Sequence, residues 1–185
     1  MPQQFTAQRF IWFCVKLFVL GPVCLFAWWQ VMPSYAFGLG QFTAAILKHL
    51  FGFPIEGVVV HREGFMNTDT VMGYVVHGRE ATLPIAQLVS NIATFLALML
   101  ATGKLGWRRL ALGIAAGVAI LAFTHAAYLI TFYSMAQAIA RDQTYFVAVA
   151  QVLITLPFVL WIVFAFWNQL PWAKSSSNSP DEDLS

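Results

Sequence analysis

Long apolar stretches separated by short polar segments dominate this sequence of 185 residues. A helix needs about 20 mostly apolar residues to cross the hydrocarbon core of a bilayer. We expect transmembrane helices at about residues 10–31, 84–102, 107–135 and 144–167. The pattern therefore predicts an all-α membrane protein in which residues 1–174 form a single polytopic domain.

The first apolar stretch has a competing interpretation as a secretory signal peptide. In that case Ser34-Tyr35-Ala36 would be a small-x-small cleavage site. The run Phe10–Val31 is longer than the roughly 7–15 residues of a signal-peptide core, which favours a membrane span. Gly21 and Pro22 predict a kink within it, as membrane helices tolerate.

The orientation follows from the basic residues in the short loops, because Lys and Arg are enriched on the cytoplasmic side. The densest basic cluster lies in 103–109 and contains Lys104, Arg108 and Arg109. With this loop inside, both termini are cytoplasmic and the segment 32–83 faces outward. The expected location is a bacterial inner membrane, with a multi-pass topology. Residues 175–185 are rich in Ser, Asn, Asp and Glu, which predicts a disordered cytoplasmic tail.

The outer segment 32–83 shows two further patterns. Phe42, Ile46, Leu50 and Phe53 follow a helical spacing, which predicts an amphipathic helix at the outer interface. After it, 57–60 and 70–77 are rich in β-branched and apolar residues, with the turn-forming sequence 66–69 between them. We expect a small β-hairpin there, followed by Thr82 as a cap of the second span and Pro84 in its first turn.

Composition supports a membrane protein and argues against several functional classes. The chain is 59% hydrophobic and 10% charged, whereas soluble domains carry roughly 25% charge. The net charge of +2, without a basic stripe, does not indicate a nucleic-acid partner. Cys14 and Cys24 both lie inside the first span, and the sequence contains no zinc spacing or phosphate-binding glycine loop. No cofactor is predicted.

Five polar residues of the last three spans fall at one depth. A helical rise of about 1.5 Å per residue places all of them in the outer third of the bilayer. They are Gln87 and Asn91 in the second span, His125 and Tyr128 in the third, and Gln151 in the fourth. Two interpretations stay open, namely interhelical hydrogen bonds worth about 0.6 kcal/mol each and a binding site.

Other polar residues were weighed for the same site. Arg79 and Glu80 precede the second span, either as an interfacial ion pair or as a charged rim over the polar layer. His49, His61 and His77 lie in the outer segment, but their spacing matches no metal-ligand motif, so no metal is predicted. The small-x-x-x-small sequence 113–117 predicts close helix packing.

The order of these features resembles the exosortase and archaeosortase family (exosortase H-like), whose members are membrane-embedded cysteine transpeptidases. The resemblance rests on Phe51–Ile55, a short outer β region, the cytoplasmic Trp107–Arg109 turn and a Gly-rich span ending in Phe132-Tyr133. It covers roughly residues 40–168. It implies a setting in surface-protein sorting or exopolysaccharide export, with proteins that carry a C-terminal sorting tail as the family's substrates.

The family's catalytic residues are missing at the matching positions. Ile85–Asn91 contains no cysteine, His125–Tyr128 stands where the family has Asn-x-x-Arg, and Tyr145 or Phe146 stands where it has His. Without a thiolate no thioester can form, and Ser90 has no identifiable base. The resemblance therefore predicts a non-catalytic relative.

The predicted function is binding of a peptide, a lipid or a partner helix at an outer-leaflet polar pocket. The candidate residues are Gln87, Asn91, His125, Tyr128, Gln151 and Arg79. The expected partners are membrane lipid and either a partner membrane protein or a sorting-tail peptide, with no nucleic acid. The alternatives are a transpeptidase- or hydrolase-like enzyme using His125 and Tyr128, and a small transporter subunit.

Overall fold

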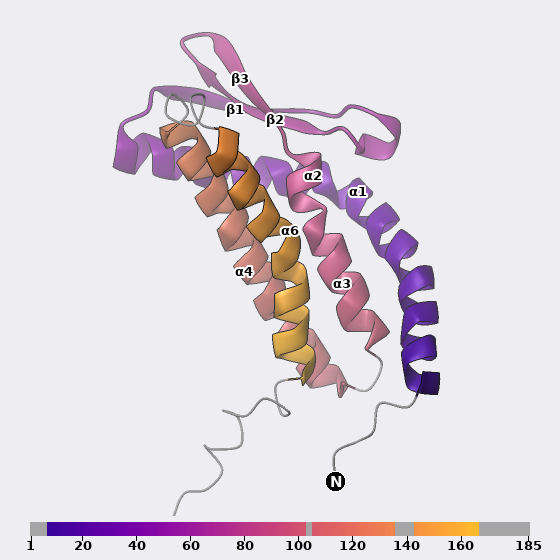
Figure 1. The fold of residues 1–185 in the computed structure, drawn as a ribbon. Coiled ribbons are helices and arrows are strands. Elements are labelled where there is room, and N and C mark those ends of the chain that lie inside the picture. Colours follow the sequence, from indigo (N-terminus) through magenta and orange to yellow (C-terminus); the bar gives the residue numbers. More distant parts are fainter. Residues whose placement is uncertain (1–6, 103–104, 136–142, 167–185) are drawn as a thin grey trace, which may run out of the picture.

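The computed structural model describes residues 7–102, 105–135 and 143–166 (Figure 1). Within them, long helices are joined at one end to a small antiparallel sheet. The helices are α1 (Ala7–Phe51), α2 (Ala86–Val89), α3 (Asn91–Ala101), α4 (Trp107–Ser134) and α6 (Gln143–Phe166). The strands are β1 (Ile55–His61), β2 (Val71–Val76) and β3 (Arg79–Pro84), with a short 3₁₀ helix, η1 (Phe65–Asn67), between β1 and β2. The predicted tail, 175–185, lies outside the described residues.

Two helices of the described chain are long and apolar enough to cross a membrane. They are Phe10–Phe51 within α1 and Trp107–Ser134, which is α4. The apolar helical stretches Ala86–Ala101 and Gln151–Phe166 are shorter. The prediction of a mostly helical protein with membrane-length helices is thus confirmed, and the four-span topology stays a prediction.

Helix α1 differs from the expectation of a span followed by a separate interfacial helix, because it is continuous over 45 residues. It contains Pro33, which has no N–H and so leaves the carbonyl of Trp29, four residues earlier, without its helical donor. The side-chain amide of Asn67, from η1, donates to that carbonyl oxygen at 3.2 Å. A donor from outside the helix therefore replaces the lost hydrogen bond, and α1 bends without ending (Figure 1).

The sheet confirms the predicted hairpin and adds a strand that the sequence did not predict. β1 and β2 pair antiparallel with Val58 opposite Tyr74, and β2 pairs antiparallel with β3. His77 and Gly78, with φ of 51° and 70°, form the tight turn between β2 and β3. Positive φ at both turn positions gives a two-residue hairpin loop the twist that matches its flanking strands. The expected cap Thr82 therefore lies within β3, and the next helix begins at Ala86.

The sheet packs on the C-terminal half of α1 at close range (Figure 1). A Cβ added at Gly40 would lie 2.7 Å from Val58 Cγ1 and 2.9 Å from Met72 Sδ, so only glycine fits there without movement. The opposite side of the same helix segment carries the predicted apolar stripe. Phe42 is 57% and Leu50 75% exposed, as expected for side chains that face lipid at an interface.

The predicted small-x-x-x-small motif lies at a close helix contact. A Cβ added at Gly117 would lie 2.1 Å from the Phe95 ring, and one at Gly113 would lie 2.8 Å from Met99 Cε. Both glycines are buried. They let α4 approach α3 closely, which confirms the packing role predicted for this motif.

Candidate functional site

His125 is the centre of the buried polar residues. It lies on α4 and is fully buried. Its Nδ1 lies 2.8 Å from the Tyr35 hydroxyl of α1, and its Nε2 lies 3.1 Å from Asn91 Oδ1 of α3. An amide oxygen only accepts, so Nε2 carries the proton. In the neutral imidazole Nδ1 is then an acceptor, and the Tyr35 hydroxyl donates to it. The imidazole in this arrangement is neutral and has both nitrogens paired.

Asn91 continues this chain of hydrogen bonds to the fourth long helix. Its Nδ2 donates to the backbone carbonyl of Leu153 in α6 at 3.2 Å. Pro157, four residues after Leu153, cannot donate to that carbonyl. Asn91 therefore restores a missing helical hydrogen bond, as Asn67 does for Trp29. We call Tyr35, His125, Asn91 and the Leu153 carbonyl the four-helix network, because it joins α1, α4, α3 and α6.

The structure brings together only some of the residues predicted for the polar layer. Asn91 and His125 are in direct contact, whereas the side chains of Gln87, Gln151 and Arg79 are exposed. Tyr128 is half-buried, with its ring stacked near that of Phe132 at a centroid distance of 6.1 Å.

Local features of α2, α3 and α6 accompany the exposed positions of the two glutamines. The helix that was expected to hold Gln87 and Asn91 on one face is interrupted between α2 and α3, at Ser90. Ser90 Oγ donates to the Ala86 carbonyl at 2.6 Å instead of facing a site. On α6 the network uses the backbone carbonyl of Leu153, so the Gln151 side chain stays outside it.

Tyr35 is the network residue that the sequence analysis missed as a candidate. It lies beyond the expected end of the first span, within the Ser34-Tyr35-Ala36 sequence of the alternative signal-peptide cleavage site. A tyrosine two residues after a proline, at the outer end of an apolar helix, was the available signal.

A second set of polar contacts holds the sheet to the helices. The Tyr74 and Thr43 hydroxyls are hydrogen-bonded, and Thr43 Oγ1 also donates to the Leu39 carbonyl at 2.8 Å. Burial raises the pKa of the Tyr74 hydroxyl above its ordinary value, although the hydrogen bond with Thr43 acts in the opposite direction. Tyr133 of α4 packs against Tyr74 at a centroid distance of 4.4 Å and donates to the Ala81 carbonyl of β3 at 2.9 Å. These contacts fix β2 and β3 over α1 and α4.

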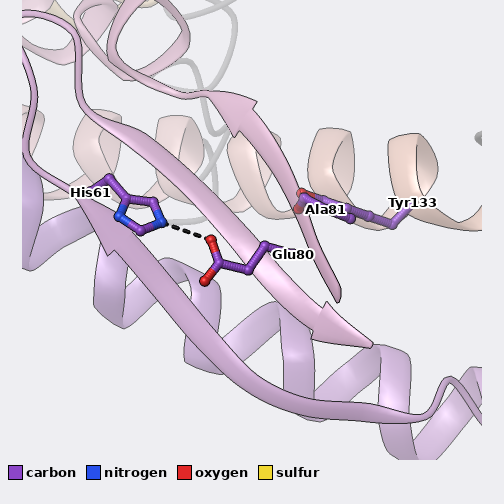
Figure 2. A network of polar contacts seen from close by, with 4 residues as sticks. All are labelled: His61, Glu80, Ala81 and Tyr133. Atoms are coloured by element: carbon purple, nitrogen blue, oxygen red, sulfur yellow. Dashed lines mark hydrogen bonds and ion pairs between the residues drawn. The ribbon is translucent and has the colours of Figure 1, made fainter. Parts of the chain in front are cut away.

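The outer face of the sheet carries an exposed hydrogen bond between a histidine and a glutamate (Figure 2). His61 Nε2 of β1 lies 2.9 Å from Glu80 Oε2 of β3, across the central strand. Gly73, on that strand, has no side chain to separate them. Within the described ranges, no group of three His, Cys, Asp or Glu residues could hold a metal ion.

An open apolar groove of about 450 Å³ lies between α1 and α4, next to the four-helix network. Its lining is almost entirely apolar, and consists of Tyr35, Gly38, Leu39, Phe42, Ala122 and Phe123. Phe42 and Phe123 form exposed walls, and a Cβ added at Gly38 would meet nothing within 4 Å. Tyr35 is shared, since it lines the groove and also bonds His125. The groove suits an apolar chain or side chains rather than a polar ligand.

Comparison with known proteins found no matching family model, no matching curated protein and no matching solved structure.

Proposed function

We propose that this chain is a non-catalytic, exosortase-like multi-pass protein of a bacterial inner membrane. In this proposal it binds the apolar segment of a membrane partner at its outer-leaflet groove. The partner would be a protein with a C-terminal sorting tail, in surface-protein sorting or exopolysaccharide export. The observation that carries the binding proposal is the apolar groove between α1 and α4.

The arrangement of the helix ends supports the proposed topology. The N-terminal end of α1, the turn before α4 and the C-terminal end of α6 lie at one end of the helices, and the sheet lies at the other (Figure 1). Arg108 and Arg109 are in the first turn of α4, at the end of the helices that is opposite the sheet. A cytoplasmic position for the basic end places both termini inside and the sheet outside.

The four-helix network supports a structural role for His125. Both imidazole nitrogens and both polar atoms of the Asn91 amide are already engaged in hydrogen bonds between helices. A general base must reach the proton that it abstracts. His125 could take a proton from a bound substrate only by giving up one of its bonds, which favours binding over catalysis on that substrate by His125 itself.

One observation favours the enzyme alternative. Tyr35, His125 and Asn91 follow each other as phenol, imidazole and amide, the order of a nucleophile, its base and an orienting group. In that case the reacting group would be Tyr35, not Tyr128. Tyr35→Phe would then abolish turnover of a sorting-tail substrate while leaving its binding intact. The binding proposal instead expects no turnover by the wild-type protein or by the variant.

Photo-crosslinking tests the binding proposal. In one variant, a photoreactive phenylalanine analogue replaces Phe123, which lines the groove. In the control variant it replaces Leu112, which lies elsewhere on α4 and is 71% exposed. The cells also express a reporter protein with a C-terminal sorting tail. We expect an adduct with the reporter from position 123 and not from 112. Gly38→Leu should fill the groove and abolish this adduct, while Gly21→Leu, outside the groove, should not.

Two results would contradict the proposal. The first is an equal yield of reporter adducts from both positions, which would indicate random encounters in the membrane. The second is an adduct at position 123 that contains only lipid, which would make the groove a lipid site.

A further inference from the structure

The loop between β1 and β2 is compact and fixed in position. The Asp69 N–H donates to the Glu63 carbonyl at 3.0 Å, and the Thr70 hydroxyl donates to the Asn67 carbonyl at 2.8 Å. Met66 and Asn67 have φ of 55° and 68°, a left-handed backbone that costs energy and persists only when its surroundings hold it. These contacts give the segment 63–70 a defined shape.

The same loop has a defined height along α1. Asn67 Nδ2 donates to the Trp29 carbonyl of α1 at 3.2 Å. From Phe10 to Trp29 a helix rises about 28 Å, close to the roughly 30 Å thickness of a bilayer's hydrocarbon core. If α1 spans the membrane from Phe10, Trp29 lies at the outer boundary of the hydrocarbon. The loop is then held at the level of the lipid headgroups.

Phe65 projects from this loop as an exposed aromatic side chain. Its exposed fraction is 77%, the second highest among the exposed large apolar side chains of the described residues, after that of Phe18. Arg62 and Glu63, just before it, are exposed and charged. An apolar tip beside charged residues matches the interfacial zone, where aromatic rings bury an apolar body near polar headgroups.

We propose that the loop 63–69 is a membrane anchor that inserts Phe65 into the outer leaflet, at the boundary between headgroups and acyl chains. This inference rests on the proposed topology. It gives the sheet a second attachment to the membrane, besides its packing on α1. The sheet would thereby be held at a fixed tilt over α1.

Spin labelling tests the anchor. Cys14 and Cys24 are first replaced by Ala, and a single cysteine is then placed at Phe65, at Phe18 on α1, or at Arg79, the exposed first residue of β3. The labelled proteins are reconstituted into vesicles of phosphatidylethanolamine and phosphatidylglycerol. Collision rates with oxygen, which concentrates in lipid, and with a water-soluble nickel complex then report the depth of each label.

We expect the label at position 65 to favour oxygen, with a depth between those at 18 and 79. A label at 65 as accessible to nickel as the label at 79, with the label at 18 still in lipid, would overturn the anchor and leave the topology intact. Protection of position 65 from both reagents would indicate a protein contact and would also overturn it. A water-accessible label at 18 would instead refute the topology, and the anchor with it. Unchanged circular dichroism of each variant controls for folding.

Discussion

The side-chain amide of Asn91 donates to the carbonyl oxygen of Leu153 at 3.2 Å, the carbonyl that Pro157 leaves without a helical donor. Asn67 makes the same kind of bond to the Trp29 carbonyl, which Pro33 leaves unpaired. In hydrocarbon an unsatisfied backbone carbonyl costs several kcal/mol, because no water can replace the missing donor. Each asparagine thus stabilises a proline-containing helix from a separate segment of the chain.

Loss of the Asn91 amide should destabilise the protein strongly. Asn91→Ala leaves both the Leu153 carbonyl and the His125 Nε2–H without a partner, at a cost of about 1–3 kcal/mol for each group. Gln87→Ala is the matched control, because Gln87 is exposed on the preceding helix. The measurement is the free energy of unfolding in detergent, followed by circular dichroism. Equal, small losses in the two variants would show that the four-helix network contributes nothing to stability.

Substitutions of His125 should separate hydrogen bonding from packing. His125→Ala removes the bonds to Tyr35 and Asn91 and should cost more than His125→Gln, which keeps a donor and an acceptor. Tyr35→Phe removes one bond with little change in volume, and should cost about 1 kcal/mol. The same unfolding measurement ranks the three variants. Equal, negligible losses for the two His125 variants would contradict the buried position of this side chain.

The contact between α3 and α4 should tolerate no larger residue at Gly117. A Cβ there would lie 2.1 Å from Phe95, so Gly117→Ala must displace a buried ring. Overpacking of this kind typically costs about 1–3 kcal/mol. Gly21→Ala is the control, since an added Cβ meets nothing within 4 Å. A thermal melt in detergent compares the two, and a melting temperature for Gly117→Ala at or above that of Gly21→Ala would disprove the close contact.

The sequence predicted the features that depend on local patterns. Apolar runs identified the helices, β-branched runs around a turn identified β1 and β2, and the spacing of Gly113 and Gly117 identified a close contact. Depth along each helix was sufficient to suggest that Asn91 and His125 meet.

The remaining features depend on tertiary contacts that no local pattern encodes. The segment Arg79–Pro84, which has no run of β-branched residues, forms a strand because β2 lies beside it. Helix α1 continues through Pro33, and the donor that this proline lacks comes from Asn67 in another segment. Depth alone does not show which way a side chain points, so Gln87 and Gln151 were grouped with Asn91 although their side chains are exposed.

Reporter fusions test the proposed membrane topology, on which the outer groove and the membrane anchor both depend. Alkaline phosphatase, which is active only outside the cytoplasm, is fused after Asn67 in the sheet region or after Gly103 in the basic loop. The proposed topology predicts an active enzyme at Asn67 and an inactive one at Gly103, with the opposite pattern for a fluorescent protein that matures only in the cytoplasm. The same location for both fusions would contradict the topology, and with it the outer groove and the membrane anchor.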